Sequence, residues 1–122
     1  MAEVNLNFDI NGNLSSIGDS LANFIYSLAL SNTLSKPVGK KLSNRVLARA
    51  LKEAGLRDRA GTRHNYHTLG NFAEHMIFYG WARDKITIEE CVKILEARLG
   101  DGSEETEVNA FAELLREIAC RE

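Results

Sequence analysis

The chain has 122 residues, of which 44% are hydrophobic and 26% charged, and its formal net charge at pH 7 is −2. This length suits a single core, so we expect one domain over residues 1–122. No apolar run approaches the roughly 20 residues of a bilayer span, and the first residues lack the features of a signal peptide. Two cysteines without metal-ligand spacing predict reduced, packed thiols. Together these features predict a cytoplasmic protein that does not enter membranes.

Charge is distributed unevenly along the chain. Residues 36–67 carry nine basic residues against Glu53 and Asp58, whereas residues 101–122 carry seven acidic residues against Arg116 and Arg121. A basic middle on an acidic protein favours a localised surface for a polyanion. A solvated helix face followed by a flexible loop is the commoner explanation of a charge run alone. The sequence pI of about 5.9 argues against indiscriminate coating of nucleic acid.

The N-terminal residues have the period of a strand. Val4, Leu6, Phe8 and Ile10 alternate with polar residues, and such alternation is typical of a half-buried strand. No later segment offers a convincing second strand. Residues 1–12 are therefore predicted to form an extended arm that packs on the body of the protein or on a partner subunit.

Five helices are predicted after the arm, which makes the fold class all-α. The first covers residues 13–31, where apolar residues recur at three- and four-residue spacing. The second covers residues 41–54, with Gly55 at the position of a C′ glycine. An exposed basic loop leads to the third, over residues 68–82. Thr87 and Glu90 form a capping box that opens the fourth helix, which ends near Leu99, and the fifth covers residues 103–122.

Two carboxylates occupy the apolar sides of predicted helices, Asp19 in the first and Glu74 in the third. Ser15 precedes Asp19 by one turn and Asn71 precedes Glu74 by three residues, so each pair shares a helix face. Gly18 weakens the first helix by about 1 kcal/mol relative to Ala, which indicates a site or close backbone packing. If the two helices pack side by side, the acids could share a proton or hold a hard cation such as Mg²⁺. A nearby Lys, Arg or backbone amide could also satisfy a buried acid.

Three segments of the chain form a recognisable series: SSIGDSLANFIYSLALS, KKLSNRVLARALKEAGL and LGNFAEHMIFYGWARDKITIEECVKIL. They resemble, respectively, the signature helix, the next block and the third block of the endonuclease domain in the ribonuclease III family. The segments follow the family's order. They define a core over residues 13–99, with the arm before it and the C-terminal helix of residues 103–122 after it.

The resemblance implies an all-helical homodimer that binds Mg²⁺ and cleaves double-stranded RNA. It implies that Asp19 and Glu74 are catalytic and hold Mg²⁺ or Mn²⁺, with Asn71 as a neutral carbonyl ligand and Ser15 acting through water. Ser15 stands where the family has a glutamate, and Asn71 stands where it has an aspartate. A catalytically inactive dimer that binds structured RNA is therefore the alternative.

The basic middle then supplies the predicted RNA-binding surface. A-form RNA is recognised largely through shape, phosphates and 2′-hydroxyls, which suits a basic surface without aromatic platforms. The candidates are Lys40, Lys41, Asn44, Arg45, Arg49, Arg57, Arg59, Arg63 and His64. A DNA-binding helix-turn-helix built from residues 44–54 and 68–82 is the lowest alternative, because the connection is far longer than that motif's turn of roughly 3–4 residues.

A stripe on the first helix predicts where two subunits meet. Leu21, Phe24, Ile25 and Leu28 recur at helical spacing and could be self-complementary across a two-fold axis. Residues 4–10 of the arm are expected to cover the partner.

Overall fold

The computed structural model describes residues 12–61 and 65–122, and the side chains from residue 16 onwards. Residues 1–11 of the predicted arm lie outside the described residues, as do the side chain of Ser15 and the predicted RNA contacts Arg63 and His64. Gly12, the last residue of the predicted arm, is already helical, so the first helix begins one residue earlier than predicted.

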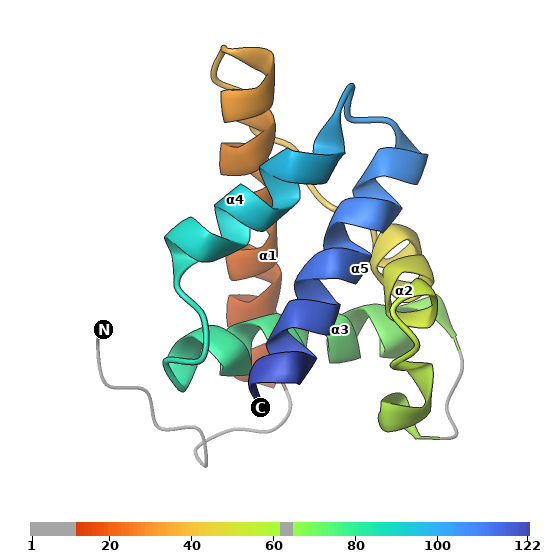
Figure 1. Ribbon diagram of the computed structural model, residues 1–122. Helices are drawn as coiled ribbons and strands as arrows, with labels where there is room; N and C mark the ends of the chain where they lie inside the picture. The colour runs from red at the N-terminus through yellow and green to blue at the C-terminus, as the bar shows by residue number, and fades with distance from the viewer. Residues whose placement is uncertain (1–11, 62–64) are drawn as a thin grey trace.

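The described part of the chain is all-helical, as predicted. The helices are α1 (Gly12–Leu34), α2 (Asn44–Glu53), α3 (Tyr66–Ala82), α4 (Ile88–Leu99) and α5 (Glu104–Arg121), with a 3₁₀ turn η1 (Arg57–Ala60). In Figure 1, α1 stands upright, α3 lies across its lower part, and α4 and α5 cover the side towards the viewer. The turn η1 falls within the segment predicted to be a loop. The helical arrangement brings the N-terminal half of α1 against α3.

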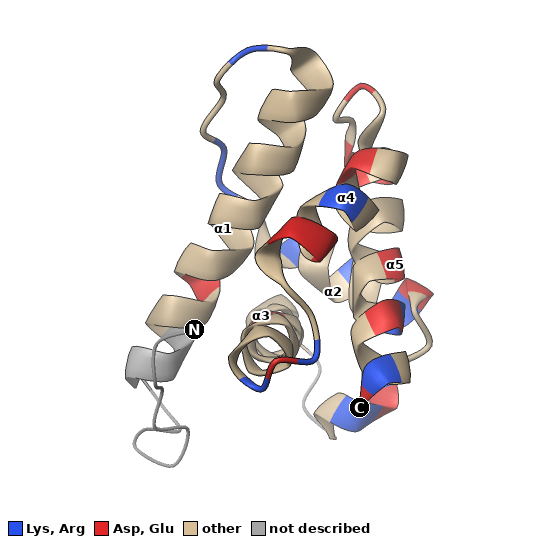
Figure 2. Cartoon of the chain, turned by 60° about the vertical axis from the view of Figure 1, so that its left-hand side comes forward, with Lys and Arg blue, Asp and Glu red and all other residues tan. Residues whose placement is uncertain are grey.

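The segment between α1 and α2 is extended and differs from its prediction. It runs back along α1 before α2 begins (Figure 2). The second helix begins at Asn44 rather than Lys41, because Ser43 takes the N-cap position and its Oγ accepts a hydrogen bond from the backbone N–H of Val46 at 3.1 Å. An N-cap of this kind satisfies a backbone donor that has no partner inside the helix.

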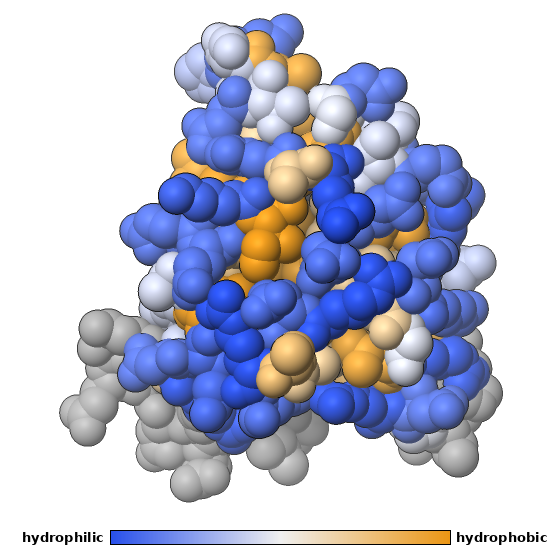
Figure 3. Space-filling view, viewed as in Figure 1, coloured by the Kyte–Doolittle hydropathy of each residue, from blue (hydrophilic) through white to orange (hydrophobic). Residues whose placement is uncertain are grey.

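Polar residues dominate the surface over α4 and α5. Figure 3 shows this face as mostly hydrophilic, with small hydrophobic areas between the helices. Cys91 is buried as predicted, whereas Cys120 is exposed, so the prediction of a packed thiol is wrong for Cys120. Within residues 12–61 and 65–122, every helix is too short or too polar to span a bilayer.

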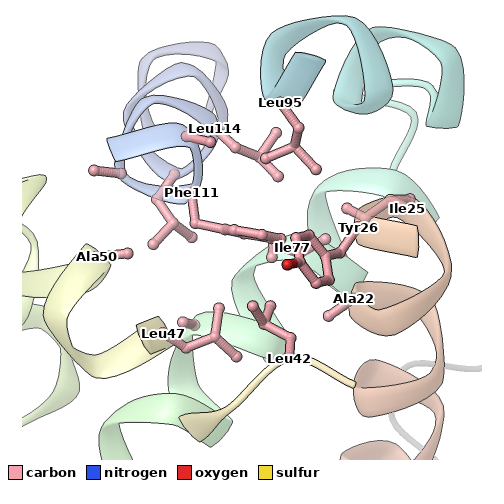
Figure 4. Packing of buried hydrophobic residues seen from close by; sticks show 14 of the residues in the cluster. Ala22, Ile25, Tyr26, Leu42, Leu47, Ala50, Ile77, Leu95, Phe111 and Leu114 are labelled. Atoms are coloured by element: carbon pink, nitrogen blue, oxygen red, sulfur yellow. The ribbon is translucent and has the colours of Figure 1, made fainter. Parts of the chain in front are cut away.

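The core lies where α1, α3 and α5 converge. Figure 4 shows Tyr26 of α1, Ile77 of α3 and Phe111 of α5 pointing towards one another, and the rings of Tyr26 and Phe111 lie 5.9 Å apart between centroids. Leu42, from the segment between α1 and α2, also enters this core. Each fully buried large apolar side chain contributes roughly 1.5–3 kcal/mol to folding, so the core fixes that segment as well as the helices.

A buried carboxylate links polar side chains from three segments beside the same core. The carboxylate of Glu107 on α5 accepts a hydrogen bond from the Tyr26 hydroxyl. It also forms an ion pair with the Lys40 ammonium at 3.1 Å. Burial, more than the hydrogen bond to Glu107, raises the pKa of Tyr26 above its ordinary value. These three groups connect α1, the extended segment and α5.

Candidate functional site

Asp19 of α1 and Glu74 of α3 lie close enough together for Asp19 to raise the pKa of Glu74. The two helices approach each other closely at Gly18. A Cβ atom on this residue would lie 3.5 Å from the carbonyl oxygen of Glu74 and 3.6 Å from its Cβ atom, which is ordinary van der Waals contact. The glycine that weakens α1 therefore brings its backbone against α3 at the two acids.

The acids open onto a cleft of about 390 Å³. Its lining combines acidic, amide, hydroxyl and ammonium groups with one apolar residue. The lining residues are Asp19, Lys41, Leu42, Ser43, Asn44, Asn71 and Glu74. Three of the four predicted metal ligands thus meet at one cleft.

Glu74 is the buried acid of this cleft. It is only 2% exposed, and its Oε2 is buried without a hydrogen-bond partner among the described residues. Burial raises the pKa of Glu74 to about 8, assisted by the hydrogen bond and negative charge of Asp19 and opposed by the charge of Lys41. Leaving a buried carboxylate oxygen unpaired is costly, so Glu74 gains most from a ligand that binds carboxylate oxygens.

The donor set fits a hard divalent cation held by few protein ligands. Mg²⁺ prefers oxygen ligands, keeps several waters and is often bound through one or two carboxylates. Asp19 and Glu74 supply two carboxylates, and Asn71 lines the same cleft with an amide. In the described part of the chain, no three His, Cys, Asp or Glu side chains gather as a metal site, so a cation would be held by the carboxylate pair with neutral ligands and water.

The raised pKa of Glu74 predicts a stability that falls with pH. A glutamate of the unfolded chain has a pKa of about 4.3. Between about pH 4.5 and pH 8, Glu74 therefore keeps its proton in the folded state but has lost it in the unfolded chain. The stabilisation by this group is therefore complete below about pH 4.5 and is lost as pH rises through about 8. We expect a change of a few kcal/mol in the free energy of unfolding without metal. Urea unfolding of the wild type and of Glu74→Gln at several pH values isolates the contribution of Glu74, because the other titrating groups are common to both proteins. Parallel pH profiles would contradict the prediction.

The predicted RNA-binding residues that the structure describes have different surroundings, and Arg57 is the first residue of η1. Asn44 and Lys41 line the cleft, whereas several arginines form ion pairs with acidic residues of α5 and with its C-cap residue, Glu122. These pairs are Arg45–Glu104 at 3.1 Å, Arg49–Glu104 at 2.6 Å, Arg49–Glu105 at 2.7 Å and Arg59–Glu122 at 2.7 Å. The basic middle of the sequence therefore faces the acidic end of the same chain. Sequence analysis missed this pairing, although the opposite charges of the two segments were its signal.

Gly70 is a residue that sequence analysis did not assign to the site. A Cβ atom there would lie 2.7 Å from Oδ1 of Asn44, so only glycine lets Asn44 reach the face of α3. Asn44 lies there with its Nδ2 at 3.1 Å from Nδ1 of His67. Gly70 thereby fixes the start of α2 at the edge of the cleft.

A family model for ribonuclease III matches residues 12–121. The chain belongs to the ribonuclease III family. The match includes all five helices and therefore both Asp19 and Glu74. No curated protein matches the chain. Membership indicates a function in RNA processing, and the geometry of the carboxylate cleft is the basis for a more specific proposal.

Proposed function

We propose that this ribonuclease III-family chain is a divalent-metal-dependent endoribonuclease acting on double-stranded RNA. The observation that carries the proposal is the buried, unpaired Oε2 of Glu74 beside the partly exposed carboxylate of Asp19. Asp19 and Glu74 would hold Mg²⁺ or Mn²⁺, with Asn71 as a neutral ligand and Ser15 acting through water. When bound, the cation polarises the scissile phosphate and lowers the pKa of water. The protein orients the cation and keeps the inner carboxylate out of solvent.

The ion pairs on α2 are compatible with RNA binding. Arg45 contacts Glu104, and both side chains are well exposed. Exposed pairs of this kind contribute only about 0.2–1 kcal/mol, so an RNA phosphate can replace the glutamate at small cost. Binding of this kind should weaken with salt, because each phosphate contact releases condensed counterions.

A second candidate is a catalytically inactive protein that binds structured RNA. The observation that favours it is the composition of the cleft, where Asn71 is neutral and the ammonium of Lys41 contacts Asp19 at 3.5 Å. The cleft therefore carries little net negative charge for a divalent cation.

One assay separates the two candidates. A double-stranded RNA hairpin is incubated with the purified chain in Mg²⁺, in Mn²⁺ and in excess chelator, and both cleavage products and the bound fraction are measured. Metal-dependent products support the endoribonuclease. Binding without products in any metal supports the inactive protein, and neither binding nor products overturns both candidates.

We also propose that the chain forms a homodimer through the exposed apolar side of α1. Ile25 does not belong to this surface, because it is fully buried in the core, which corrects the predicted stripe. Phe24 and Leu28 are exposed, and they border a groove of about 550 Å³ that also contacts Trp81 and Ile88. A C2 interface needs such a self-complementary patch.

Phe24→Asp should convert the dimer into a monomer, since it introduces a charge into the centre of the proposed interface. Tyr66→Asp is the matched control, because Tyr66 and Phe24 are both 54% exposed and Tyr66 lies on α3. Light scattering at micromolar concentration should give two chains for the wild type and the control, and one chain for Phe24→Asp. A wild-type mass of one chain contradicts the proposal.

A further inference from the structure

The extended segment between α1 and α2, residues 36–43, is fixed to α1 by polar side chains at regular spacing; we call it the strap. Ser31 Oγ accepts from the backbone N–H of Val38 at 2.8 Å and donates to its carbonyl oxygen at 3.0 Å. One turn earlier, Ser27 Oγ accepts from the N–H of Lys40 at 2.9 Å and donates to its carbonyl oxygen at 3.0 Å. Each hydroxyl therefore satisfies both backbone groups of one strap residue.

A third contact extends the same register towards the carboxylates. Asn23, four residues before Ser27, accepts from the N–H of Leu42 through Oδ1 at 2.7 Å. Four residues of helix rise about 6 Å, and two residues of extended chain rise about 6.6 Å. The two periods match closely enough for three successive contacts. The contacts fix the strap along α1, and they end within one turn of Asp19.

The strap determines where Lys41 points. Successive side chains of an extended segment lie on opposite sides, so Leu42 enters the core whereas Lys41 faces outward. The outward side lies over the cleft. There the Lys41 Nζ lies 3.5 Å from Oδ2 of Asp19, and the lysine side chain is 75% exposed. A positive charge thus lies beside the carboxylate pair.

We propose that Lys41 is a tethered cation of the carboxylate site, held by the strap so that a divalent ion binds only by displacing its ammonium from Asp19. Asn23, Ser27 and Ser31 are then positioning residues that act through Lys41. The inference rests on the proposed function, because it assumes that Asp19 and Glu74 hold a metal. It also explains how a cleft with two acids remains occupied by positive charge before metal binds.

The test is a titration with Mn²⁺ alone, followed by electron paramagnetic resonance of the free ion. Lys41→Met should tighten Mn²⁺ binding about threefold to tenfold, because an ammonium no longer repels or competes with the ion. Lys36→Met is the matched control: it removes the same charge from the opposite end of the strap and should change the dissociation constant less than twofold. Circular dichroism confirms that each variant is folded.

A double-mutant cycle tests the positioning role. Ser27→Ala should tighten Mn²⁺ binding about twofold to fivefold in the wild type, because it frees the strap near Lys41. The same change should have no effect on Mn²⁺ binding in the Lys41→Met background, since Ser27 acts through Lys41. A residue needed only for folding would give the same effect in both backgrounds, and that result overturns the positioning role.

Asn71→Asp separates failure of this inference from failure of the proposed function. Suppose that Asn71→Asp binds Mn²⁺, and that Lys41→Met tightens Mn²⁺ binding neither in the wild type nor in the Asn71→Asp variant. The carboxylates then hold metal, and the proposed role of Lys41 is wrong. Weaker binding by Lys41→Met also overturns the inference, because Lys41 would then assist the ion. If no variant binds Mn²⁺, the cleft is not a metal site and both proposals fail.

Discussion

Asp19→Asn should abolish metal-dependent cleavage of double-stranded RNA, with a loss of at least about 100-fold in single-turnover rate. The amide has the same shape and can still hydrogen-bond to Glu74, but it removes the exposed carboxylate of the pair. The remaining acid, Glu74, has a pKa raised to about 8 by burial and is largely protonated at neutral pH. A metal provides several kcal/mol of transition-state stabilisation, and each 1.36 kcal/mol corresponds to tenfold in rate.

Folding of the Asp19→Asn variant should be nearly unchanged. The pair of Asp19 with Lys41 is exposed and so contributes little, and we expect a midpoint of thermal unfolding within a few degrees of the wild type. Asp58→Asn, an identical change at an exposed position of η1, should retain full activity. Asn71→Asp combined with Ser15→Glu should raise metal affinity. If Asp19→Asn unfolds the chain, and the double variant neither binds metal nor cleaves RNA, then Asp19 is a structural acid.

The helices were predictable because their signals are local. Apolar spacing identified all five, and the capping box of Thr87 and Glu90 is present at the start of α4. Gly55 has a φ of 76°, which suits the predicted C′ glycine. The strap was not predictable in this way. Ser27 and Ser31 look like ordinary polar positions of a helix surface. Their partners are backbone groups, which are the same in almost every residue, so the sequence does not indicate these hydrogen bonds.

The candidate site was predictable only in part, for a related reason. A carboxylate on the apolar side of a helix is unusual, so Asp19 and Glu74 could be singled out before their helices were placed together. The role of Lys41 depends on the direction of an extended segment. Likewise, the pairing of Arg49 with Glu104 depends on α2 lying beside α5. Tertiary contacts therefore decided which charges face the cleft and which neutralise each other.

Glu107→Ala should be the most destabilising of the substitutions considered for this fold, with a loss of about 2–4 kcal/mol in the free energy of unfolding. Glu107 is 6% exposed and accepts from both Tyr26 and Lys40. Its removal leaves the buried Tyr26 hydroxyl without its partner and opens a cavity beside that hydroxyl. Breaking a buried pair by removing one partner typically costs 3–5 kcal/mol, and the partial exposure of Lys40 lowers the expected value. Urea unfolding measures the loss.

Two further variants show whether Glu107→Ala destabilises the fold because it leaves the Tyr26 hydroxyl unpaired or because it removes a negative charge. Glu105→Ala removes an exposed carboxylate from the same helix, where it pairs with Arg49, and should cost less than about 1 kcal/mol. Tyr26→Phe in the Glu107→Ala background should recover part of the loss, because the unpaired hydroxyl is no longer buried. Equal losses for the Glu105 and Glu107 variants would contradict a special role for the buried carboxylate. Since Lys40 adjoins Lys41 on the strap, Glu107→Ala should also loosen the strap, so its effect on Mn²⁺ binding should have the same sign as that of Ser27→Ala.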